Sequence, residues 1–408
     1  MSVNPELKQL KEQIKSIIRS NSDRGFVPYG GCNQICVEML ALSEEAERSA
    51  DKLYSLGAHL LILVEVIKLI SHADTSSGMV TDVVHQSLQV VDDVCRLAEG
   101  KERQLMFEAI LTTAKNKAFQ EWNEYGYALL KSAVRFVDDH KQADKLRALY
   151  PILGKMYLDK EYPDMYLIEL GIIGRLEGEE AERLYLMEHL EVDELRALAV
   201  ERAMSMKQYD LAEKLCMDAM KNDRRRTVYV SQWAQFLERI YAETSNIEKL
   251  GELLHRILLQ GHYSYFAKLK AHSEAQGTWS EDKKDRLLDE VAKVVQSHEY
   301  ASLLNQQREN RRLLFHLEAH PYLIADYGKE LATYYPDETF SIFNRYILKF
   351  AADISDRRGY KAVCKLIKQC YAAGGKSEAL QLIDRLQELY PRRPALIDEL
   401  TSLRKKLK

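Results

Sequence analysis

YKAVCKLIKQCYAAGGKSEALQLIDRLQELYPRRPALIDEL, residues 360–400, contains a folding unit that recurs, less regularly, along the whole chain. Apolar side chains follow Tyr360 at i+3, i+4, i+7 and i+11, which is the spacing of a single helix face. Gly374 and Gly375 end this helix, since glycine enters the left-handed conformation without a steric penalty. Ser377 is then expected to accept a hydrogen bond from a free amide at the start of a second helix.

The second helix of this unit carries its own apolar stripe, which includes Leu386, and Pro391 stops it because proline has no amide hydrogen. Pro394 suits the first turn of a third helix, where no backbone donor is required. A helix with one apolar stripe cannot bury that stripe alone. Successive hairpins bury their stripes by stacking, so the sequence predicts an all-α fold in which helical-hairpin repeats form an α-solenoid.

The composition supports long helices. A chain of 408 residues that is 46% hydrophobic and 29% charged can form two or more helical domains or one long array. Its 8 prolines and 18 glycines are too few for an all-β or disordered protein, and they fall mostly between helix-periodic runs. The net charge of −4 provides no overall attraction to nucleic acid or to an anionic membrane, although a locally basic face is compatible with it.

Cysteine usage and the N-terminal residues indicate a cytoplasmic protein. Six cysteines are scattered mostly along apolar helix faces, where a thiol behaves as a small apolar group, and we expect them to be reduced. The first 20 residues read as a charged amphipathic helix and not as a secretory signal. The most apolar run, residues 60–64, is followed by Glu65 and Lys68, so no membrane span is predicted.

Helical spacing predicts a bundle in the N-terminal half. The helix expected over residues 50–71 is apolar nearly all round from Leu56 to Ile70, which is typical of a helix covered on several sides and makes it the expected centre of this bundle. Residues 80–95 are rich in valine, yet their spacing is helical. Single helices are also expected over residues 121–138 and 142–158, the latter kinked or shortened at Pro151.

The helical pairs become shorter and more regular in the C-terminal half. We therefore expect an N-terminal helical domain over residues 1–176 and a C-terminal repeat domain over residues 177–408, with no low-complexity linker between them. The hairpin of residues 192–205 and 209–220 contains MKQYDLAEKLCMDAM, which resembles the second helix of a tetratricopeptide repeat in its alternation of small and large residues. This resemblance implies a tetratricopeptide-like, right-handed solenoid, although the consensus positions do not run the length of the chain.

Two pieces of the chain resemble the helical region that follows the zinc finger in bacterial SWIM zinc-finger proteins. One is IIRSNSDRGFVPYGGCNQICVEML with the later VEVIKLISHADTSSGMVTDVV, and the other is CYAAGGKSEALQLIDRLQELYPRRPALIDEL. The resemblance implies a bacterial protein with an α-helical, repeat-like fold and no enzymatic activity. A SWIM finger needs Cys-x-Cys followed by Cys-x-His, and neither pattern occurs here. The zinc and DNA-related role is therefore not carried over: either the finger has been lost, or the sequence is a relative or fragment that never held one.

No catalytic or metal-binding constellation stands out in the sequence. Cys32 and Cys36 have no companion cysteine or histidine nearby, so they are interpreted as core residues rather than ligands. The histidines show no ligand spacing, and no P-loop, GxGxxG or GxSxG motif occurs. Carboxylate pairs such as Glu179 and Glu180 are adjacent, so they point in different directions on a helix and make poor acid and base partners. We expect no enzymatic activity, no cofactor and no metal.

Arginine clusters with nearby tyrosines are the candidates for a partner-binding surface. Arginine forks bind carboxylates and phosphates, and tyrosine, of which the chain has 23 against 10 phenylalanines, is enriched at interfaces. The clusters are also compatible with ion pairs to neighbouring helices, with the tyrosines filling grooves between helices. The candidate residues are Arg225, Arg226, Tyr229, Arg308, Arg311, Arg312, Arg358, Tyr360, Arg392 and Arg393.

These observations favour a non-enzymatic scaffold or adaptor that holds a protein or peptide partner in a helical-repeat groove of its C-terminal half. An accessory factor of a nucleic-acid-associated complex is the alternative, which rests on the SWIM resemblance and the arginine clusters and is opposed by the negative net charge. A third hypothesis is an enzyme with an unrecognised site between helices, for which convergent carboxylates or histidines in a pocket would be the sign.

Overall fold

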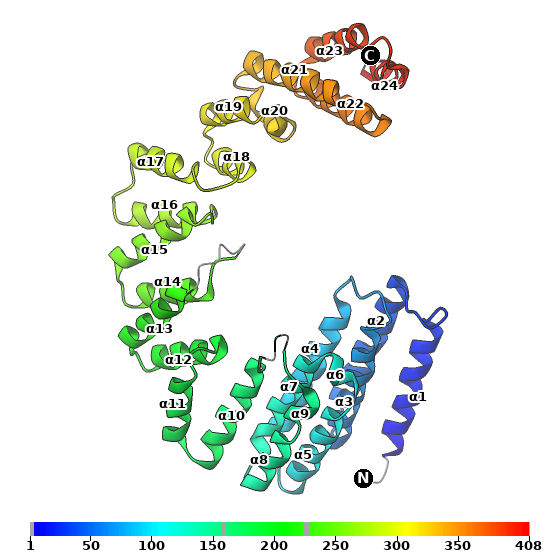
Figure 1. Cartoon of the computed structure of the whole chain (residues 1–408), viewed down its shortest axis with the longest axis vertical. Helices are drawn as coiled ribbons and strands as arrows, with labels where there is room; N and C mark the ends of the chain where they lie inside the picture. Colours follow the sequence, from blue (N-terminus) through cyan, green and yellow to red (C-terminus); the bar gives the residue numbers. More distant parts are fainter. Residues whose placement is uncertain (1–3, 157, 159, 223–228, 408) are drawn as a thin grey trace. The chain divides into compact units, whose positions relative to one another are not determined.

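The computed structural model describes residues 4–156, 158, 160–222 and 229–407, and these residues form helices joined by short turns (Figure 1). In this part of the chain, extended pairing is confined to two isolated β-bridges, Asp23 with Phe26 and Val27 with Ala73. The all-α, helical-repeat fold class predicted from the sequence is confirmed. The right-handed, tetratricopeptide-like detail of that prediction stays a prediction.

Contacts divide the chain into two compact units, Met1–Leu215 and Cys216–Lys408. The sequence predicts a boundary between residues 176 and 177 instead. At that position α10 (Pro163–Leu176) packs against α11 (Glu179–Glu188) and α12 (Asp193–Ser205), so all three helices belong to the first unit. A tight turn rather than a linker joins α10 to α11, since Gly178 there has a φ of +93°.

The first unit is a bundle of helices with one continuous apolar core. Its elements before α10 are α1 (Pro5–Ser20), α2 (Tyr29–Glu47), α3 (Lys52–Leu69), α4 (Met79–Arg96), α5 (Lys101–Ala114), α6 (Ala118–Glu121), α7 (Asn123–Ala133), the 3-10 turn η1 (Val134–Phe136), α8 (His140–Arg147) and α9 (Tyr150–Leu153).

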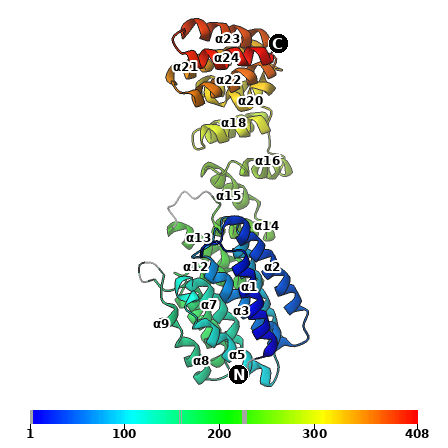
Figure 2. The ribbon, with the colours of Figure 1, turned by 90° about the vertical axis from the view of Figure 1, so that its right-hand side faces the viewer.

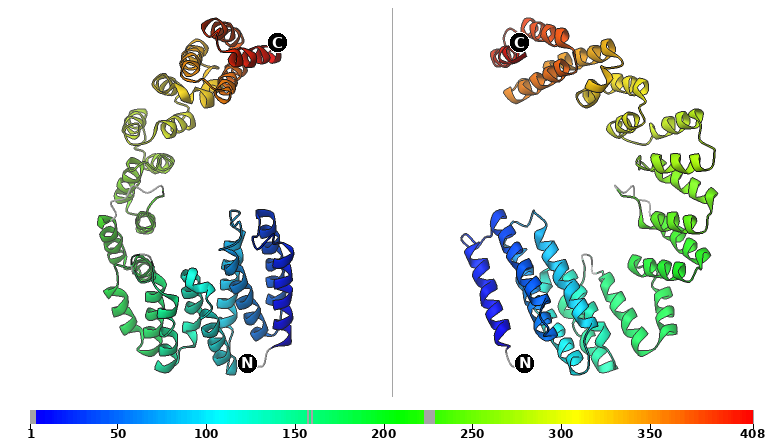
Figure 3. Two further views of the ribbon diagram at one scale, coloured as in Figure 1. Left: turned by 45° about the vertical axis from the view of Figure 1, so that its right-hand side comes forward. Right: turned by 180° about the vertical axis from the view of Figure 1, so that it is seen from behind.

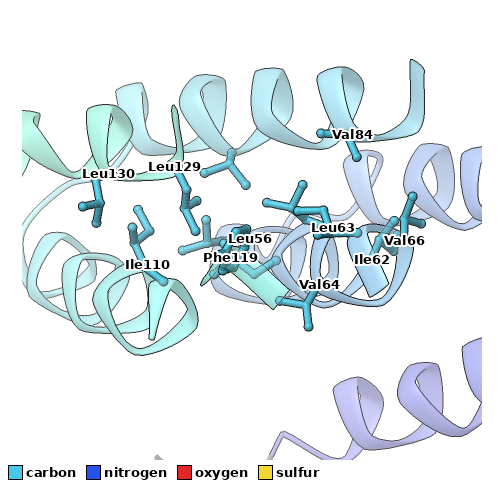
Figure 4. Close-up of a cluster of buried hydrophobic side chains, with 14 of the residues drawn as sticks. Leu56, Ile62, Leu63, Val64, Val66, Val84, Ile110, Phe119, Leu129 and Leu130 are labelled. Atoms are coloured by element: carbon cyan, nitrogen blue, oxygen red, sulfur yellow. The ribbon is translucent and has the colours of Figure 1, made fainter. Parts of the chain in front are cut away.

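Helix α3 is the centre of this bundle, as its nearly all-round apolar sequence predicts. The Asp51 side chain caps its start by accepting hydrogen bonds from the amides of Leu53 and Tyr54. Most side chains of α3 are buried, and the helix packs against α1, α2, α4 and α5. Figure 4 shows this core, in which side chains from α3 to α7 meet: Leu56, Ile62, Leu63, Val64, Val66, Val84, Ile110, Phe119, Leu129 and Leu130.

Two predicted helices of this unit are divided in the structure. The helix expected over residues 121–138 is interrupted at Trp122, whose φ of −128° and ψ of 60° separate α6 from α7, and it ends in the turn η1. The helix expected over residues 142–158 is shortened, as predicted, near Pro151. That proline lies in the first turn of α9, where its missing amide hydrogen costs nothing. The valine-rich segment forms α4, so its helical spacing prevailed over the strand propensity of valine.

The second unit is a row of helical hairpins (Figures 1 and 3). Neighbours along the chain pack in pairs, such as α14 with α15, α15 with α16 and α18 with α19. Helix α13 (Tyr209–Asn222) spans the division between the units. The elements that follow it are α14 (Gln232–Glu243), α15 (Ile247–Leu259), α16 (Tyr265–Ala275), α17 (Glu281–Val291), α18 (Ser297–Gln306), α19 (Asn310–Ala319), η3 (Pro321–Leu323), α20 (Ile324–Leu331), α21 (Pro336–Asp353), α22 (Arg357–Ala372), α23 (Lys376–Leu389) and α24 (Pro394–Leu407).

Helices α22 and α23 form the C-terminal hairpin (Figure 2), and its glycine turn is the one that the sequence predicts. Gly374 has a φ of +107°, as expected of a glycine that ends a helix, and a Cβ on Gly375 would lie 2.7 Å from Cδ1 of Phe340. The cap predicted at Ser377 is wrong. Helix α23 already begins at Lys376, so Ser377 lies inside the first turn, where its hydroxyl accepts a hydrogen bond from Nε2 of Gln381 at 3.2 Å.

Candidate functional site

The predicted arginine and tyrosine surface begins at the start of the second unit. Arg225 and Arg226 lie outside the residues that the structure describes. Tyr229 precedes α14 and is 82% exposed. Helix α14 begins at Gln232, where Ser231 caps it by accepting a hydrogen bond from the amide of Trp233.

Three of the predicted arginines flank the turn between α18 and α19. Arg308 is exposed and has a φ of +58°. Arg311 is exposed and lies over the ring of Phe315, at 5.9 Å from its centroid. Arg312 instead binds two carboxylates of α17, those of Asp285 and Asp289, at 3.1 and 2.6 Å. These ion pairs therefore link α19 to α17.

The other four candidates lie on α22 and on the turn between α23 and α24. Arg358 and Arg392 are exposed. Tyr360 is 5% exposed and belongs to the core, which corrects its assignment to a contact surface. Arg393 donates hydrogen bonds from Nη1 to the carbonyl oxygens of Ala351 and Ile354, at 2.8 and 2.9 Å. It therefore caps the end of α21 and is not free to bind a partner.

The predicted set thus separates into two kinds of residue. Arg312, Tyr360 and Arg393 are held inside the fold by ion pairs, burial and backbone hydrogen bonds. The remaining exposed arginines form no ion pair within the described residues and stay candidates for a contact surface: Arg308, Arg311, Arg358 and Arg392.

A groove of about 690 Å³ lies in the first unit, between α1, α3 and α5. Its floor is one face of α3, formed by Gly57, Leu60, Leu61 and Val64, which recur at helical spacing. Leu60 and Val64 are buried, whereas Leu61 is only half-buried. Val64 lies at the margin of the cluster of core side chains in Figure 4. The groove therefore has an apolar floor that continues the core of the bundle.

A glycine on α3 allows α1 to approach the floor closely. A Cβ on Gly57 would lie 2.6 Å from Cδ1 of Leu7, so the leucine rests directly on the α3 backbone. Helix α1 buries Leu10, Ile14 and Ile17 against the bundle. The edge of α1 that lines the groove lies beside this buried face. That edge carries Lys8, Lys11, Glu12 and Lys15.

The two walls of the groove differ in charge. The α1 wall carries three lysines and one glutamate, whereas the α5 wall is formed by uncharged side chains of α5 and of the turn after it, those of Ala109, Thr112, Thr113 and Asn116. Glu65 and Lys68 of α3 complete the rim and pair with each other at 2.7 Å.

Two of the lysines on the α1 wall are unpaired. Lys15 binds Glu12 at 2.9 Å, and this hydrogen bond lowers the pKa of the glutamate. Lys8 and Lys11 are exposed and form no ion pair with any residue that the structure describes. The α1 wall therefore presents uncompensated positive charge beside an apolar floor.

Sequence reasoning predicted a groove in the C-terminal half and did not single out this one. The usable signal was the i, i+3, i+7 spacing of Lys8, Lys11 and Lys15. It is not decisive alone, because the part of α3 that stays uncovered depends on where α1 and α5 pack.

A smaller recess of about 550 Å³ lies between α15, α16 and α17. A Cβ on Gly251 in its wall would lie 3.0 Å from Nε2 of His272. His255 hydrogen-bonds through Nε2 to Oε2 of Glu290 at 2.7 Å, and the buried hydroxyl of Ser273 has no partner among the described residues. The lining mixes glutamates, histidines and a lysine, so no single charge selects a ligand there.

The buried thiols are poorly suited to chemistry. Burial raises the pKa of Cys36 to about 12, and it raises the pKa of Cys32 as well. Both are therefore protonated at neutral pH, whereas nucleophiles and metal ligands require the thiolate. In the described part of the chain, no three histidine, cysteine or carboxylate side chains are grouped so that they could hold a metal ion.

No described helix combines the length and the apolar character needed to cross a membrane.

Comparison with known proteins identifies no family. No protein-family model matches the chain, and no curated protein matches it. Among solved structures, a "circular tandem repeat protein with novel repeat topology and enhanced subunit contact surfaces" aligns with 98% of this chain and 96% of its own, at 13% identity and a TM-score of 0.22. A TM-score this low carries no inference, so the fold class rests on the helices themselves. The resemblance to SWIM proteins stays a prediction.

Proposed function

We propose that the chain is a non-enzymatic, cytoplasmic scaffold that binds a helix of a partner protein in the groove between α1, α3 and α5. The observation that carries the proposal is the apolar floor of this groove, on which Leu61 is half-buried although its neighbours Leu60 and Val64 belong to the core. An apolar strip between polar walls is the surface that helix-in-groove recognition uses. Burying Leu61 under a partner's apolar face would remove it from water.

The dimensions of the groove suit a helix. The floor residues from Gly57 to Val64 span two turns of α3, which is about 10 Å of helix axis. A partner helix lying along this row would place side chains at i, i+3, i+4 and i+7 onto it. Helices α1 and α5, one on each side, would pack against such a helix as neighbouring helices of a bundle do.

The scaffold proposal extends to the second unit only in part. Arg308, Arg311, Arg358 and Arg392 are accessible and would serve as a separate contact surface for a partner. The nucleic-acid alternative has less support, because Arg312 and Arg393 are held within the fold.

The test is affinity purification of the tagged chain from its native host, with and without nuclease, read by mass spectrometry. Thr112 is exposed on the α5 wall, so Thr112→Trp would fill the groove without removing a core atom. His85→Trp, at an exposed position of α4 outside the groove, is the matched control. We expect a nuclease-resistant protein partner that is recovered with the wild type and the control and lost with Thr112→Trp.

Two results would contradict the proposal. Equal recovery with Thr112→Trp would place the partner on another surface, and the exposed arginines of the second unit would be tested next. Recovery of nuclease-sensitive material only would favour a nucleic-acid-associated role.

A further inference from the structure

The charge difference between the walls of the α1/α3/α5 groove restricts what can occupy it. The rim carries four lysines and two glutamates, and each glutamate is paired with a lysine, Glu12 with Lys15 and Glu65 with Lys68. Lys8 and Lys11 remain, both on the α1 wall. The opposite wall has only uncharged side chains.

We propose that the groove binds an amphipathic helix whose apolar face is flanked by carboxylates on one edge and by uncharged polar residues on the other. This inference rests on the proposed function, because it names the partner of the same groove. Lys8 and Lys11 are three residues apart and point to the same side of α1, so carboxylates one turn apart on the partner would meet both.

The asymmetry also sets the direction of the bound helix. Turning an amphipathic helix end for end in a groove exchanges its two edges. Carboxylates placed on one edge would face Lys8 and Lys11 in one direction, and Thr112 and Asn116 in the other. Charge complementarity at an interface rim fixes register and rejects wrong partners more than it adds affinity. The lysines therefore select the partner and its direction, while the apolar floor supplies the contact area.

The two unpaired lysines are exposed, which limits how much they add to the affinity for an acidic helix. An exposed ion pair contributes little, and salt screens it. Two such pairs would make an acidic peptide bind about two- to thirty-fold more tightly than a neutral peptide at low salt. This preference would shrink as salt is added, whereas the contribution of the apolar face would persist.

The test uses the full chain and three synthetic fluorescent helical peptides with an identical Leu-rich apolar face. One edge of that face carries Glu in the first peptide, Gln in the second and Lys in the third. Fluorescence anisotropy at low and high salt gives the affinities. We expect the order Glu, Gln, Lys from tightest to weakest for the wild-type chain, and loss of all binding in Thr112→Trp.

A charge-reversal variant provides the rescue experiment. Lys8→Glu combined with Lys11→Glu should prefer the Lys peptide over the Glu peptide, since the sign of the α1 wall is inverted. The control combines Lys101→Glu and Lys141→Glu, two exposed lysines outside the groove, and should keep the wild-type order. Circular dichroism and thermal unfolding of each variant show whether it is folded.

The possible failures are distinguishable. If the Gln peptide binds as tightly as the Glu peptide and Thr112→Trp still abolishes binding, the charge inference is wrong and the proposed function stands. If no peptide binds, both are wrong. Two further results would assign another occupant: self-association of the wild type that Thr112→Trp abolishes, or displacement of the Glu peptide by a 20-nucleotide single-stranded RNA whose affinity falls on charge reversal.

Discussion

His59 is a buried histidine that its apolar surroundings keep in the neutral state. Its side chain is 0% exposed; Nδ1 donates to the carbonyl oxygen of Ser55 at 2.7 Å, and Nε2 accepts from the Ser43 hydroxyl at 2.9 Å. A second proton, on Nε2, would place a charge in an apolar core. Burial therefore lowers the pKa of His59.

This lowered pKa predicts a loss of stability in acid. Below the unfolded pKa of about 6.5, the unfolded chain binds a proton that folded His59 does not, so protonation favours unfolding as the pH falls. One such proton changes the free energy of unfolding by at most about 1.4 kcal/mol per pH unit. Chemical unfolding from pH 7 to pH 5 should show a smaller loss of free energy in His59→Gln than in the wild type. The exposed His85→Gln should match the wild type, and equal pH slopes in all three proteins would contradict the role assigned to His59.

At the scale of the helix, Arg393 shows why residue type alone does not identify a binding surface. Its guanidinium spans the end of α21 and lies over the ring of Tyr390, at 4.2 Å from the centroid. The adjacent Arg392 is exposed. The sequence RR at residues 392 and 393 looks like one basic cluster, yet its members have different roles because consecutive residues point in different directions.

Removing Arg393 should therefore destabilise the C-terminal helices. We expect Arg393→Ala to lower the free energy of unfolding by about 1–3 kcal/mol, since it leaves helix-end carbonyls without a charged donor. Arg392→Ala is the matched control and should change it by less than about 0.5 kcal/mol. Urea denaturation measures both, and an equal effect of the two substitutions would show that the cap contributes nothing.

Local patterns predicted the helices of this chain better than its site. The hairpin at residues 360–400 was predictable because periodicity, glycine and proline all act within a few residues. The cap at Ser377 was misplaced because a single turn can begin at either of two neighbouring positions. Predicting the groove beside Leu61 required the position of α1 relative to α3 and α5. That position follows from packing between segments far apart in the sequence, and the spacing of the α1 lysines does not reveal it.

At the scale of the whole molecule, the division into two compact units bears on how much of the chain a single core substitution destabilises. Stability in repeat arrays is approximately a sum of units and nearest-neighbour contacts, so a weakened hairpin opens without unfolding distant parts of the chain. Leu386 of α23 is 0% exposed, and α23 packs against α21, α22 and α24. Leu389, one turn further along the same helix, is 53% exposed and provides the matched control.

Leu386→Ala should cost about 2–5 kcal/mol by creating a cavity between these helices, whereas Leu389→Ala should cost less than about 0.5 kcal/mol. Hydrogen exchange read by mass spectrometry locates the loss. We expect faster exchange in α21–α24 of Leu386→Ala and unchanged exchange in α3 and α4, which pack against each other and against α2 in the first unit. Acceleration of equal size in α3 and α24 would mean that the chain unfolds as one cooperative body, and the nearest-neighbour account of the second unit would then be wrong.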